Sequence, residues 1–496
     1  MEEQKAGIRI GKRAFITAAV IILALMLVAG VLTRVIPTGA YERAVADGRE
    51  SIVADSFRYT EAARLPIWRW FTAPVEVLWG PDSTTVIVII LFILIIGGTF
   101  TLLDRCGMLR WLMGRLASRF RTRRYTLLAL MVFFFMFFGS AFGMFEELVA
   151  LVPIVVMLSY ALGWDSLVGL GMSALAVGFG FSSATLNPFT IGVAQTLAGL
   201  PAFSGVLLRI PIFIITYAVL YLFIRRYAKK LDADPKRSLV YEADAPRRAR
   251  YADGAASFGG AENERQMKRS AIVFGISLGL VLLYIIAGLV CNTLFGITAL
   301  SDISMPVMAV LFLVGGIIAA AVSQYTQSDK SAKGIFRDFL AGIGGVAPGA
   351  LLILMAMSVK HIVTTGGVMD TILYGVSNTI EGLGPSAAAL LIFGLVLVLN
   401  FFIGSASAKA FLVVPLIMPL TELVGITRQV AVQAFCFGDG FSNMIFPTNA
   451  VLMIALSLTV VSYPKWFRWT WKLQLIMLAL CALIIVGLVA IGYGPF

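Results

Sequence analysis

The chain has 496 residues, of which 59% are hydrophobic and 13% are charged, and its formal net charge is +12 at pH 7. A mean hydropathy of +0.92 excludes a soluble monomer and is typical of a polytopic membrane protein. The positive charge does not indicate nucleic acid, because Lys and Arg gather in a few segments between apolar runs. The four cysteines have no CxxC spacing and indicate neither disulfides nor a metal site.

The apolar runs, taken in chain order, divide the sequence into two repeats and predict an all-α polytopic membrane protein. The first repeat, 1–228, contains spans 14–36 and 84–103, a hairpin over 124–161, a broken span over 166–200 and a span over 204–224. A cytoplasmic linker, 229–270, and a connecting span, 271–296, come next. The second repeat, 303–496, contains spans 303–323 and 339–359, a hairpin over 385–424, a broken span over 429–461 and a span over 469–493.

The distribution of Lys and Arg predicts the orientation in the membrane. Five segments hold 29 of the 39 basic residues: 1–13, 104–124, 225–270, 324–338 and 461–472. The positive-inside rule places all five in the cytoplasm if the two hairpins are re-entrant. We therefore expect a multi-pass protein of the bacterial cytoplasmic (inner) membrane, with a cytoplasmic N-terminus and an external C-terminus.

One polar phrase occurs twice, once in each broken span. Gly178-Phe179-Gly180-Phe181-Ser182-Ser183 is followed by Pro188, and Gly438-Asp439-Gly440-Phe441-Ser442-Asn443 is followed by Pro447. Matched Gly/Pro interruptions in two halves point to the binding site of a secondary transporter, although ordinary kinks are the alternative. We place the helix breaks at the phrases themselves, where glycine permits unusual dihedral angles and the close approach of a ligand. Because the charge-derived topology makes matching spans run in opposite directions, the repeats are predicted to be inverted.

Four ionisable residues lie inside apolar stretches, where such groups are costly and are candidate site residues. Glu146 and Glu147 begin the second helix of the first hairpin, and Asp439 is expected within the second break. Lys409 either binds substrate or pairs with an acid, and one glutamate could in turn pair with Lys409 or Arg209. Sodium could bind near Ser182, Ser183, Ser442 and Asn443. The remaining substrate or ion-binding candidates are Gly178, Gly180, Thr185, Asn187, Ser405, Ser407, Gly438, Gly440, Thr448 and Asn449.

Two longer stretches carry a resemblance to a known family. Ser183-Ala184-Thr185-Leu186-Asn187-Pro188-Phe189-Thr190-Ile191-Gly192-Val193-Ala194-Gln195 and the run from Phe138-Gly139-Ser140 to Glu146-Glu147 resemble the YfcC-like branch of the DcuC-like carriers, within the ion transporter superfamily. The resemblance extends from about residue 10 to the end of the chain. It implies a dimeric scaffold domain and a transport domain that moves as an elevator.

The hairpin tips depart from the Ser-Asn-Thr of the sodium-coupled dicarboxylate relatives. Ser405-Ala406-Ser407 stands at the matching distance before Pro415, and Gly143-Met144-Phe145 stands there before Pro153. Since neither tip keeps the asparagine, sodium coordination at the tips and dicarboxylate specificity do not follow from the resemblance.

Together these features predict a secondary active transporter, an ion-coupled symporter or an exchanger, of a small carboxylated metabolite. Three acids against one lysine would repel a dianion, so an amino acid, including a basic one, is favoured over a C4-dicarboxylate. An ion channel is the alternative of another class. An enzyme is not expected, because HExxH and GxSxG are missing from the sequence, and so is the ATP-binding GxxxxGK[ST]. We expect no catalytic residue and no cofactor beyond Na⁺ or H⁺ as coupling ion. The expected partners are the substrate, membrane lipids and a second copy in a homodimer, with no nucleic acid.

Overall fold

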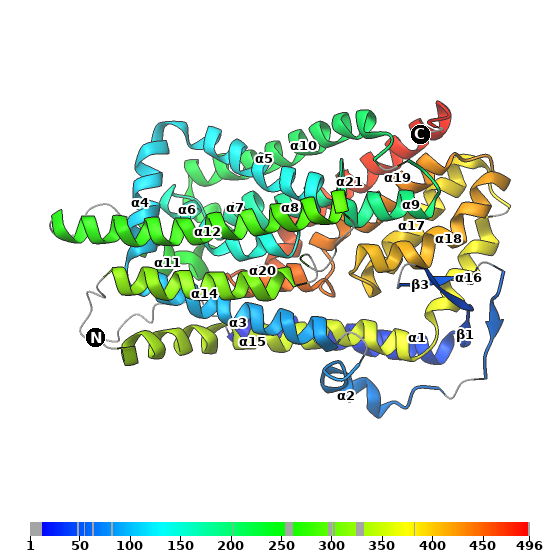
Figure 1. The fold of residues 1–496 in the computed structure, drawn as a ribbon, viewed down its shortest axis with the longest axis horizontal. Coiled ribbons are helices and arrows are strands. Elements are labelled where there is room, and N and C mark those ends of the chain that lie inside the picture. The colour runs from blue at the N-terminus through cyan, green and yellow to red at the C-terminus, as the bar shows by residue number, and fades with distance from the viewer. Residues whose placement is uncertain are drawn as a thin grey trace.

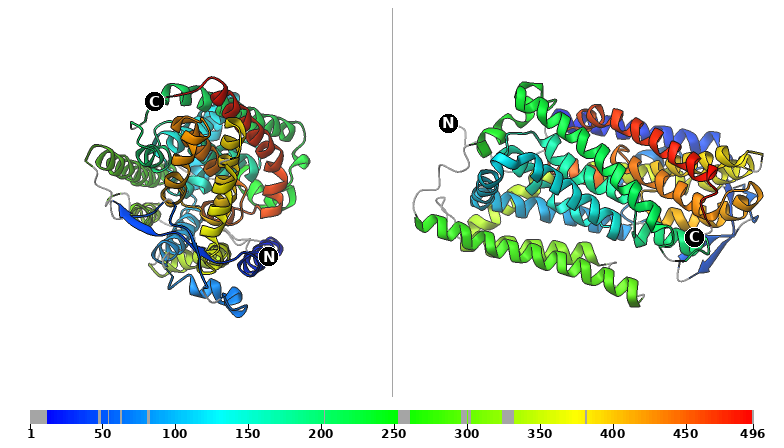
Figure 2. Two further views of the ribbon diagram at one scale, coloured as in Figure 1. Left: turned by 90° about the vertical axis from the view of Figure 1, so that its right-hand side faces the viewer. Right: turned by 90° about the horizontal axis from the view of Figure 1, so that it is seen from above.

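The computed structural model describes residues 12–46, 49–53, 55–61, 64–80, 83–201, 203–252, 261–295, 300, 303–323, 332–380 and 382–494. Nearly all of the described chain is helical, and nine of its helices are long and apolar enough to cross a membrane. The long helices lie side by side along the longest axis of the molecule (Figures 1 and 2). The chain is therefore a multi-pass integral membrane protein.

Five long helices pack together along one side of the molecule. The closest approach joins α3 and α15, where a Cβ on Gly342 would lie 2.7 Å from the backbone oxygen of Gly97 and 2.7 Å from the Cα of Gly98. Small residues allow such backbone contact between membrane helices. The five helices are α1 (Lys12–Val35), α3 (Ser83–Arg105), α12 (Ala261–Phe295), α14 (Ser304–Val322) and α15 (Ala332–Thr365).

The expectation of an all-α chain is wrong for one segment between α1 and α3. Strand β1 (Gly39–Ala40) pairs with β4 (Arg58–Tyr59), and β2 (Arg43–Ala46) pairs with β3 (Arg49–Ile52), both antiparallel, before the short helix α2 (Trp68–Glu76). Open sheet edges are not tolerated against lipid, so these strands belong outside the hydrocarbon region. Asp370, in α16 (Met369–Ile380), accepts hydrogen bonds from Tyr41 N at 3.0 Å and from the Arg43 guanidinium.

The remaining elements form the other side of the molecule and contain both copies of the repeated phrase. The chain order of the two halves matches: a hairpin, an interrupted helix and a long helix. The first half runs α4 (Met108–Phe120), η1 (Arg121–Arg123), α5 (Arg124–Phe142), η2 (Glu147–Leu151), α6 (Val152–Ala161), α7 (Ser166–Leu170), the π-helical turn η3 (Gly171–Leu175), α8 (Ala176–Ser182), η4 (Pro188–Gly192), α9 (Val193–Leu197) and α10 (Val206–Ala233). The second half runs α17 (Pro385–Phe402), α18 (Ala406–Leu423), α19 (Arg428–Gly440), η6 (Phe441–Met444), α20 (Ala450–Ser457) and α21 (Tyr463–Ala490).

The two hairpins have their open ends at opposite ends of α10. At the first, Tyr125 near the start of α5 and Trp164 after α6 both donate hydrogen bonds to Asp232, in the last turn of α10. At the second, a Cβ on Gly425, after α18, would lie 3.9 Å from Pro385 at the start of α17. Thr427, two residues later, bonds to Tyr493 O, and the Tyr493 hydroxyl donates to Gly205 O just before α10, at 3.3 Å. The open end of one helix pair therefore lies at the end of α10, and that of the other lies at its start.

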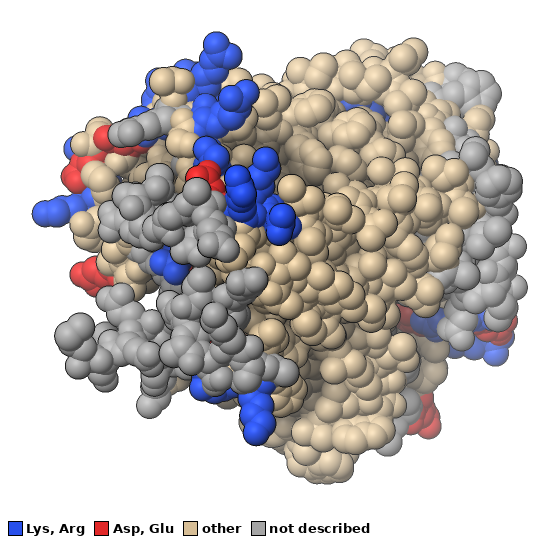
Figure 3. All heavy atoms as spheres, turned by 60° about the vertical axis from the view of Figure 1, so that its left-hand side comes forward, with Lys and Arg blue, Asp and Glu red and all other residues tan. Residues whose placement is uncertain are grey.

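Positive charge gathers at the end of the molecule that carries the first hairpin's open end (Figure 3). Exposed basic side chains there lie on α4, on the last turns of α10 and on η5 (Pro235–Arg237), and include Arg115, Arg119, Lys229, Lys230 and Arg237. This end also carries α11 (Tyr241–Ala252), which lies within the segment expected as a linker and packs against α6.

Candidate functional site

The two copies of the repeated phrase meet in the interior of the protein. A Cβ on Gly178 would lie 2.3 Å from the Met444 side chain, and one on Gly440 would lie 2.3 Å from the Ser182 side chain. The rings of Phe179 and Phe441 are in edge contact, with centroids 5.1 Å apart. Helix α8 with α19 and η6 thus forms the junction between the halves.

Both α-helices end within the repeated phrases, as expected, but the phrase glycines themselves are helical and the irregular backbone follows them. Gly178 and Gly180 lie inside α8, and Gly438 and Gly440 lie inside α19, and none of the four has a positive φ. Helix α8 ends at Ser182 and α19 ends at Gly440, with the 3-10 turn η6 following to Met444, so the irregular backbone lies around 183–187 and 445–449. The phrase glycines serve close packing: a Cβ on Gly180 would lie 2.1 Å from Met136 O. The expectation for Asp439 is corrected in the same way, because it stands in the last turn of α19.

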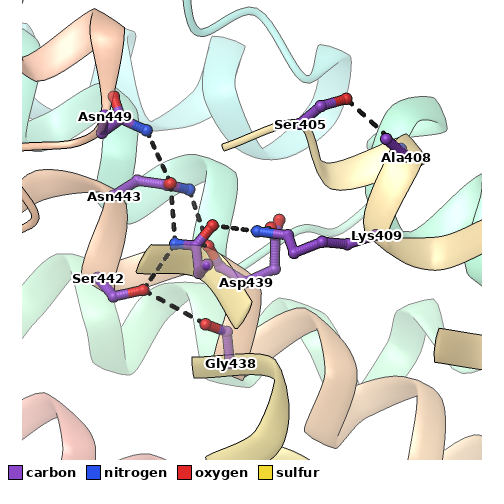
Figure 4. Close-up of polar contacts among 9 residues, drawn as sticks. Ser405, Ala408, Lys409, Gly438, Asp439, Ser442, Asn443 and Asn449 are labelled. Carbon is purple, nitrogen blue, oxygen red and sulfur yellow. Dashed lines mark hydrogen bonds and ion pairs between the residues drawn. The ribbon is translucent and has the colours of Figure 1, made fainter. Parts of the chain in front are cut away.

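Asn400, near the end of α17, connects the second hairpin to the second interrupted helix. Its Nδ2 lies within hydrogen-bond distance of Asp439 O (2.8 Å), Ser442 Oγ (2.7 Å) and Asn443 Oδ1 (2.9 Å). Asn443 Nδ2 donates to Asp439 O at 2.8 Å, and Asn449 Nδ2 donates to Asn443 Oδ1 at 2.8 Å. Ser442, Asn443 and Asn449 therefore belong to one buried polar network (Figure 4).

Lys409 extends into this network from α18 and pairs with Asp439. Its side chain is fully buried, as is that of Asp439, and its Nζ contacts both Asp439 Oδ1 and Asn400 Oδ1. Buried charges are stable only when paired and hydrogen-bonded. The alternative that Lys409 pairs with an acid is thus the observed one, and that acid is Asp439 rather than a glutamate. Arg209 donates to Ser204 O instead.

Ser140 makes the corresponding link in the first half, from α5 to the first break. Its hydroxyl donates to Ser183 O at 2.7 Å and lies 3.1 Å from Thr185 Oγ1, while Thr185 N donates to Ser140 O at 3.0 Å. The hydroxyls of Ser182 and Ser183 bond within their own helix, to Gly178 O at 2.7 Å and Phe179 O at 2.8 Å. The first break is therefore held by neutral groups.

The helical segment after each break begins with an asparagine, Asn187 or Asn449. A glycine in the turn of one hairpin, Gly143 or Gly404, lies next to each asparagine side chain. Asn187 Oδ1 accepts from Phe189 N at 2.9 Å, and Asn449 Oδ1 accepts from Leu452 N at 3.1 Å, so each side chain caps a helix start. A Cβ on Gly143, whose φ is +68°, would lie 2.2 Å from Asn187 Oδ1, and one on Gly404 would lie 3.9 Å from Asn449 Nδ2. Three buried polar atoms nearby have no hydrogen-bond partner within the described chain: Asn187 Nδ2, Thr190 Oγ1 and Thr448 Oγ1.

Both glutamates were expected to begin the second helix of the first hairpin; Glu146 lies in the turn before it and Glu147 begins the 3-10 segment η2, and their side chains face different surroundings. Glu147 Oε1 lies 3.3 Å from Ser304 Oγ, at the first residue of α14, and therefore connects the hairpin to the five-helix side of the molecule. The side chain of Glu146 is solvent-accessible. Segment η2 also contacts α20, whereas α18 contacts η4 and α9, so each hairpin touches the post-break segment of the other half.

The serines of the second hairpin turn lie outside the buried network. Ser405 is exposed and caps α18 by accepting from Ala408 N at 3.4 Å, apart from Lys409 and Asp439 in Figure 4. Ser407 is half-buried. Within the described chain, no group of three or more His, Cys, Asp or Glu side chains is arranged to hold a metal ion.

The sequence model of the DcuC family, described as a C4-dicarboxylate anaerobic carrier, matches residues 15–490. The chain belongs to the DcuC family. This DcuC-family chain is 32% identical over 427 residues to the "Putative basic amino acid antiporter YfcC" of Escherichia coli K12, covering 84% of this chain and 80% of the relative. It is 26% identical over 380 residues to an uncharacterized protein of Haemophilus influenzae, covering 77% and 71% of the two chains.

Among solved structures, this DcuC-family chain is similar to the YdaH transporter of Alcanivorax borkumensis, with 17% sequence identity and a TM-score of 0.40 over 97% of this chain and 98% of that one. Membership in a carrier family establishes the general function of the chain, which is transport. The resemblance to the YfcC-like branch, inferred from the sequence, is thereby confirmed.

Sequence reasoning missed Asn400 and Ser140 as site residues. Each is a polar residue near the end of a strongly apolar helix, which is the signal that could have found them. Such a residue needs a partner at membrane depth, and the nearest polar backbone in its own half is the broken segment.

Proposed function

We propose that this protein is a secondary active transporter that works by alternating access, with the two breaks and the two hairpin turns forming its substrate and ion site. The observation that carries the proposal is the opposed entry of the hairpins, whose open ends lie at the two ends of α10. Inverted repeats around one interior site are the architecture that lets the site open to either side in turn.

In this proposal the hairpins are re-entrant and the basic end of the molecule is cytoplasmic. The positive-inside rule supports that orientation, since the exposed basic residues gather at one end (Figure 3). The five-helix side acts as a scaffold, in a homodimer, and the side with the breaks moves past it as an elevator. The bond between Glu147 and Ser304 would then cross the sliding boundary.

The favoured substrate is an amino acid with a cationic side chain. Lys409 neutralises Asp439, which leaves the carboxylates of Glu146 and Glu147 as the uncompensated charges of the two turns and two breaks. Two carboxylates attract a guanidinium or ammonium group and repel a dianion. The name of the Escherichia coli relative agrees with this choice.

A C4-dicarboxylate is the second candidate. The description of the family favours it, and so do the helix starts capped by Asn187 and Asn449, because a helix N-terminus attracts a carboxylate. An amino acid shares one carboxylate with this class, so the helix starts do not decide between the two.

Counterflow in proteoliposomes tests both function and substrate. Vesicles containing the purified protein are preloaded with unlabelled lysine, with succinate or with buffer, and the uptake of labelled arginine and labelled succinate is measured. We expect arginine uptake only into lysine-loaded vesicles. Succinate exchange alone would establish the second candidate. Uptake that is independent of the internal solute and does not saturate would indicate a channel.

A further inference from the structure

The ammonium group of Lys409 is surrounded by the kinds of ligand that bind a free cation. Its fully buried ammonium contacts a carboxylate oxygen of Asp439 and the amide oxygen of Asn400, both of which belong to the second interrupted helix or to the hairpin helix beside it (Figure 4). No described residue donates a hydrogen bond to the other Asp439 oxygen, Oδ2. The position therefore combines negative charge, one neutral oxygen ligand and exclusion from solvent.

The backbone adds to this preference for positive charge. Asp439 stands one residue before the end of α19, where the helix dipole presents its negative end. In transporters built from broken helices, the C-terminal ends of half-helices and the carbonyl groups of the unwound segment are the usual ligands of a coupling cation. Asn400 and Asn443 hold their amide nitrogens on Asp439 O, which fixes the carbonyl at this helix end.

The first half lacks this arrangement. The residue that matches Asp439 in the repeated phrase is Phe179, and the first break is held by Ser140 and Thr185, which are neutral. Counting back from the hairpin prolines Pro415 and Pro153, the residue that matches Lys409 is Glu147. The buried ammonium is thus specific to the second half.

We propose that the Lys409 ammonium is a tethered cation that permanently occupies the cation site of the second half. The consequence for transport rests on the proposed function. Because the ammonium occupies the cation site, the second half needs no sodium ion, and exchange can proceed without a sodium gradient acting on that half. The tether is part of the chain, and its charge moves with the hairpin.

The test removes the Lys409 ammonium by substitution and offers sodium ions in its place. Purified Lys409→Ala has space beside Asp439, whereas Lys409→Met fills the same space without charge. Thermal unfolding is measured in sodium chloride and in choline chloride of equal ionic strength. We expect sodium to raise the Tm of Lys409→Ala by several degrees more than it raises the Tm of the wild type, since an ion that binds only the folded state stabilises it. Lys409→Met and the double variant Lys409→Ala/Asp439→Asn should not gain this dependence.

Equal sodium effects in wild type and Lys409→Ala would overturn the proposal. Lys409→Ala could fold too poorly to be purified. In that case, the fraction of monodisperse Lys409→Ala protein in detergent extracts is compared between sodium chloride and choline chloride. If sodium chloride does not increase this fraction, the proposal is also overturned. These measurements need no substrate. Failure of arginine counterflow would therefore leave the tethered cation standing, and failure of sodium rescue would leave the transport assay standing.

Discussion

Ser140 and Asn400 occupy equivalent positions in the two halves and make equivalent connections. Each stands two residues before the last residue of the first hairpin helix, Phe142 or Phe402. They are 260 positions apart, the same separation as Gly178 and Gly438. Each hydrogen-bonds to the interrupted helix of its own half. Every hairpin is therefore attached to the break that follows it in the chain, and the pair should move as one unit.

Removing these two connections should destabilise the protein to different extents. Ser140→Ala loses one buried hydroxyl that bonds to Ser183 O, at a cost of about 1–3 kcal/mol. Asn400→Ala should cost more, because it takes one oxygen ligand from a buried ammonium and removes an amide donor shared by Asp439 O, Ser442 Oγ and Asn443 Oδ1. Thermal unfolding in detergent measures both, with the exposed Asn378→Ala as control. A Tm for Asn400→Ala equal to that of the control would contradict the assigned network.

The repeated phrase, which the sequence indicated as the binding site, lies where the halves meet, but the arrangement of the backbone there was not predicted. The repeated phrase does mark the junction, because Gly440 packs on Ser182 across it. The breaks were assigned to the phrase glycines, a few residues too early, because a glycine needed for close helix contact and a glycine needed for a turn look the same in a single sequence. Only the three-dimensional neighbours, such as Met136 O against Gly180, distinguish the two uses.

Differences in spacing between the halves also have a physical basis that sequence reasoning did not detect. The helix N-cap Asp165 precedes Gly178 by 13 residues, whereas the N-cap Thr427 precedes Gly438 by 11. The interval in the first half contains the π-helical turn Gly171–Leu175, which accommodates extra residues in a helix. The pairing of β2 with β3 was missed although the sequence between them contains Asp47-Gly48, a frequent dipeptide of tight turns.

Substituting the packing glycines should strain two helix contacts: that of Gly440 across the junction of the halves, and that of Gly180 within the first half. Gly440→Ala would place a methyl group 2.3 Å from the Ser182 side chain, and Gly180→Ala would place one 2.1 Å from the backbone oxygen of Met136. Both variants should unfold at lower temperature, with overpacking costs of about 1–3 kcal/mol or more. Gly275→Ala in α12 is the matched control, since its Cβ would meet nothing within 4 Å. That control should be neutral or stabilising by up to about 1 kcal/mol, because alanine favours helix. Equal effects in all three variants would contradict the close packing.

The two adjacent glutamates should respond differently to neutralisation. Glu146→Gln removes an exposed charge and should lower arginine exchange strongly without changing the Tm. Glu147→Gln should give a phenotype shared with Ser304→Ala, because the two side chains bond to each other across the boundary with α14. Arginine exchange rates in proteoliposomes and Tm values are compared among the wild type, Glu146→Gln, Glu147→Gln and Ser304→Ala. Wild-type exchange in Glu146→Gln would refute its role in binding the cationic group.

A pH dependence of stability is expected from Asp165, which caps α7 at the basic end of the molecule. Its carboxylate is fully buried and accepts hydrogen bonds from Val168 N at 2.9 Å, Tyr227 Oη at 2.7 Å and Ser238 Oγ at 2.7 Å. Burial raises the pKa of Asp165 to about 6, and the nearby carboxylate of Asp244 contributes in the same direction, against the opposing effect of the hydrogen bonds. Asp244 itself is buried beside Ser166, and burial raises its pKa as well.

The sign of the effect follows from proton binding. Because the pKa of Asp165 is higher in the folded protein than in the unfolded chain, the folded state binds more protons between the two values. The free energy of unfolding should therefore rise as the pH falls from about 7 to about 5, by about 1 kcal/mol from this residue. Asp165→Asn keeps an oxygen that can cap α7 but cannot titrate, so its Tm should change less over this interval than that of the wild type. The comparison is made by thermal unfolding at both pH values, with Asp165→Asn/Asp244→Asn expected to show the smallest change. An unchanged pH dependence in Asp165→Asn would mean that this carboxylate stays ionised in the folded protein throughout the interval.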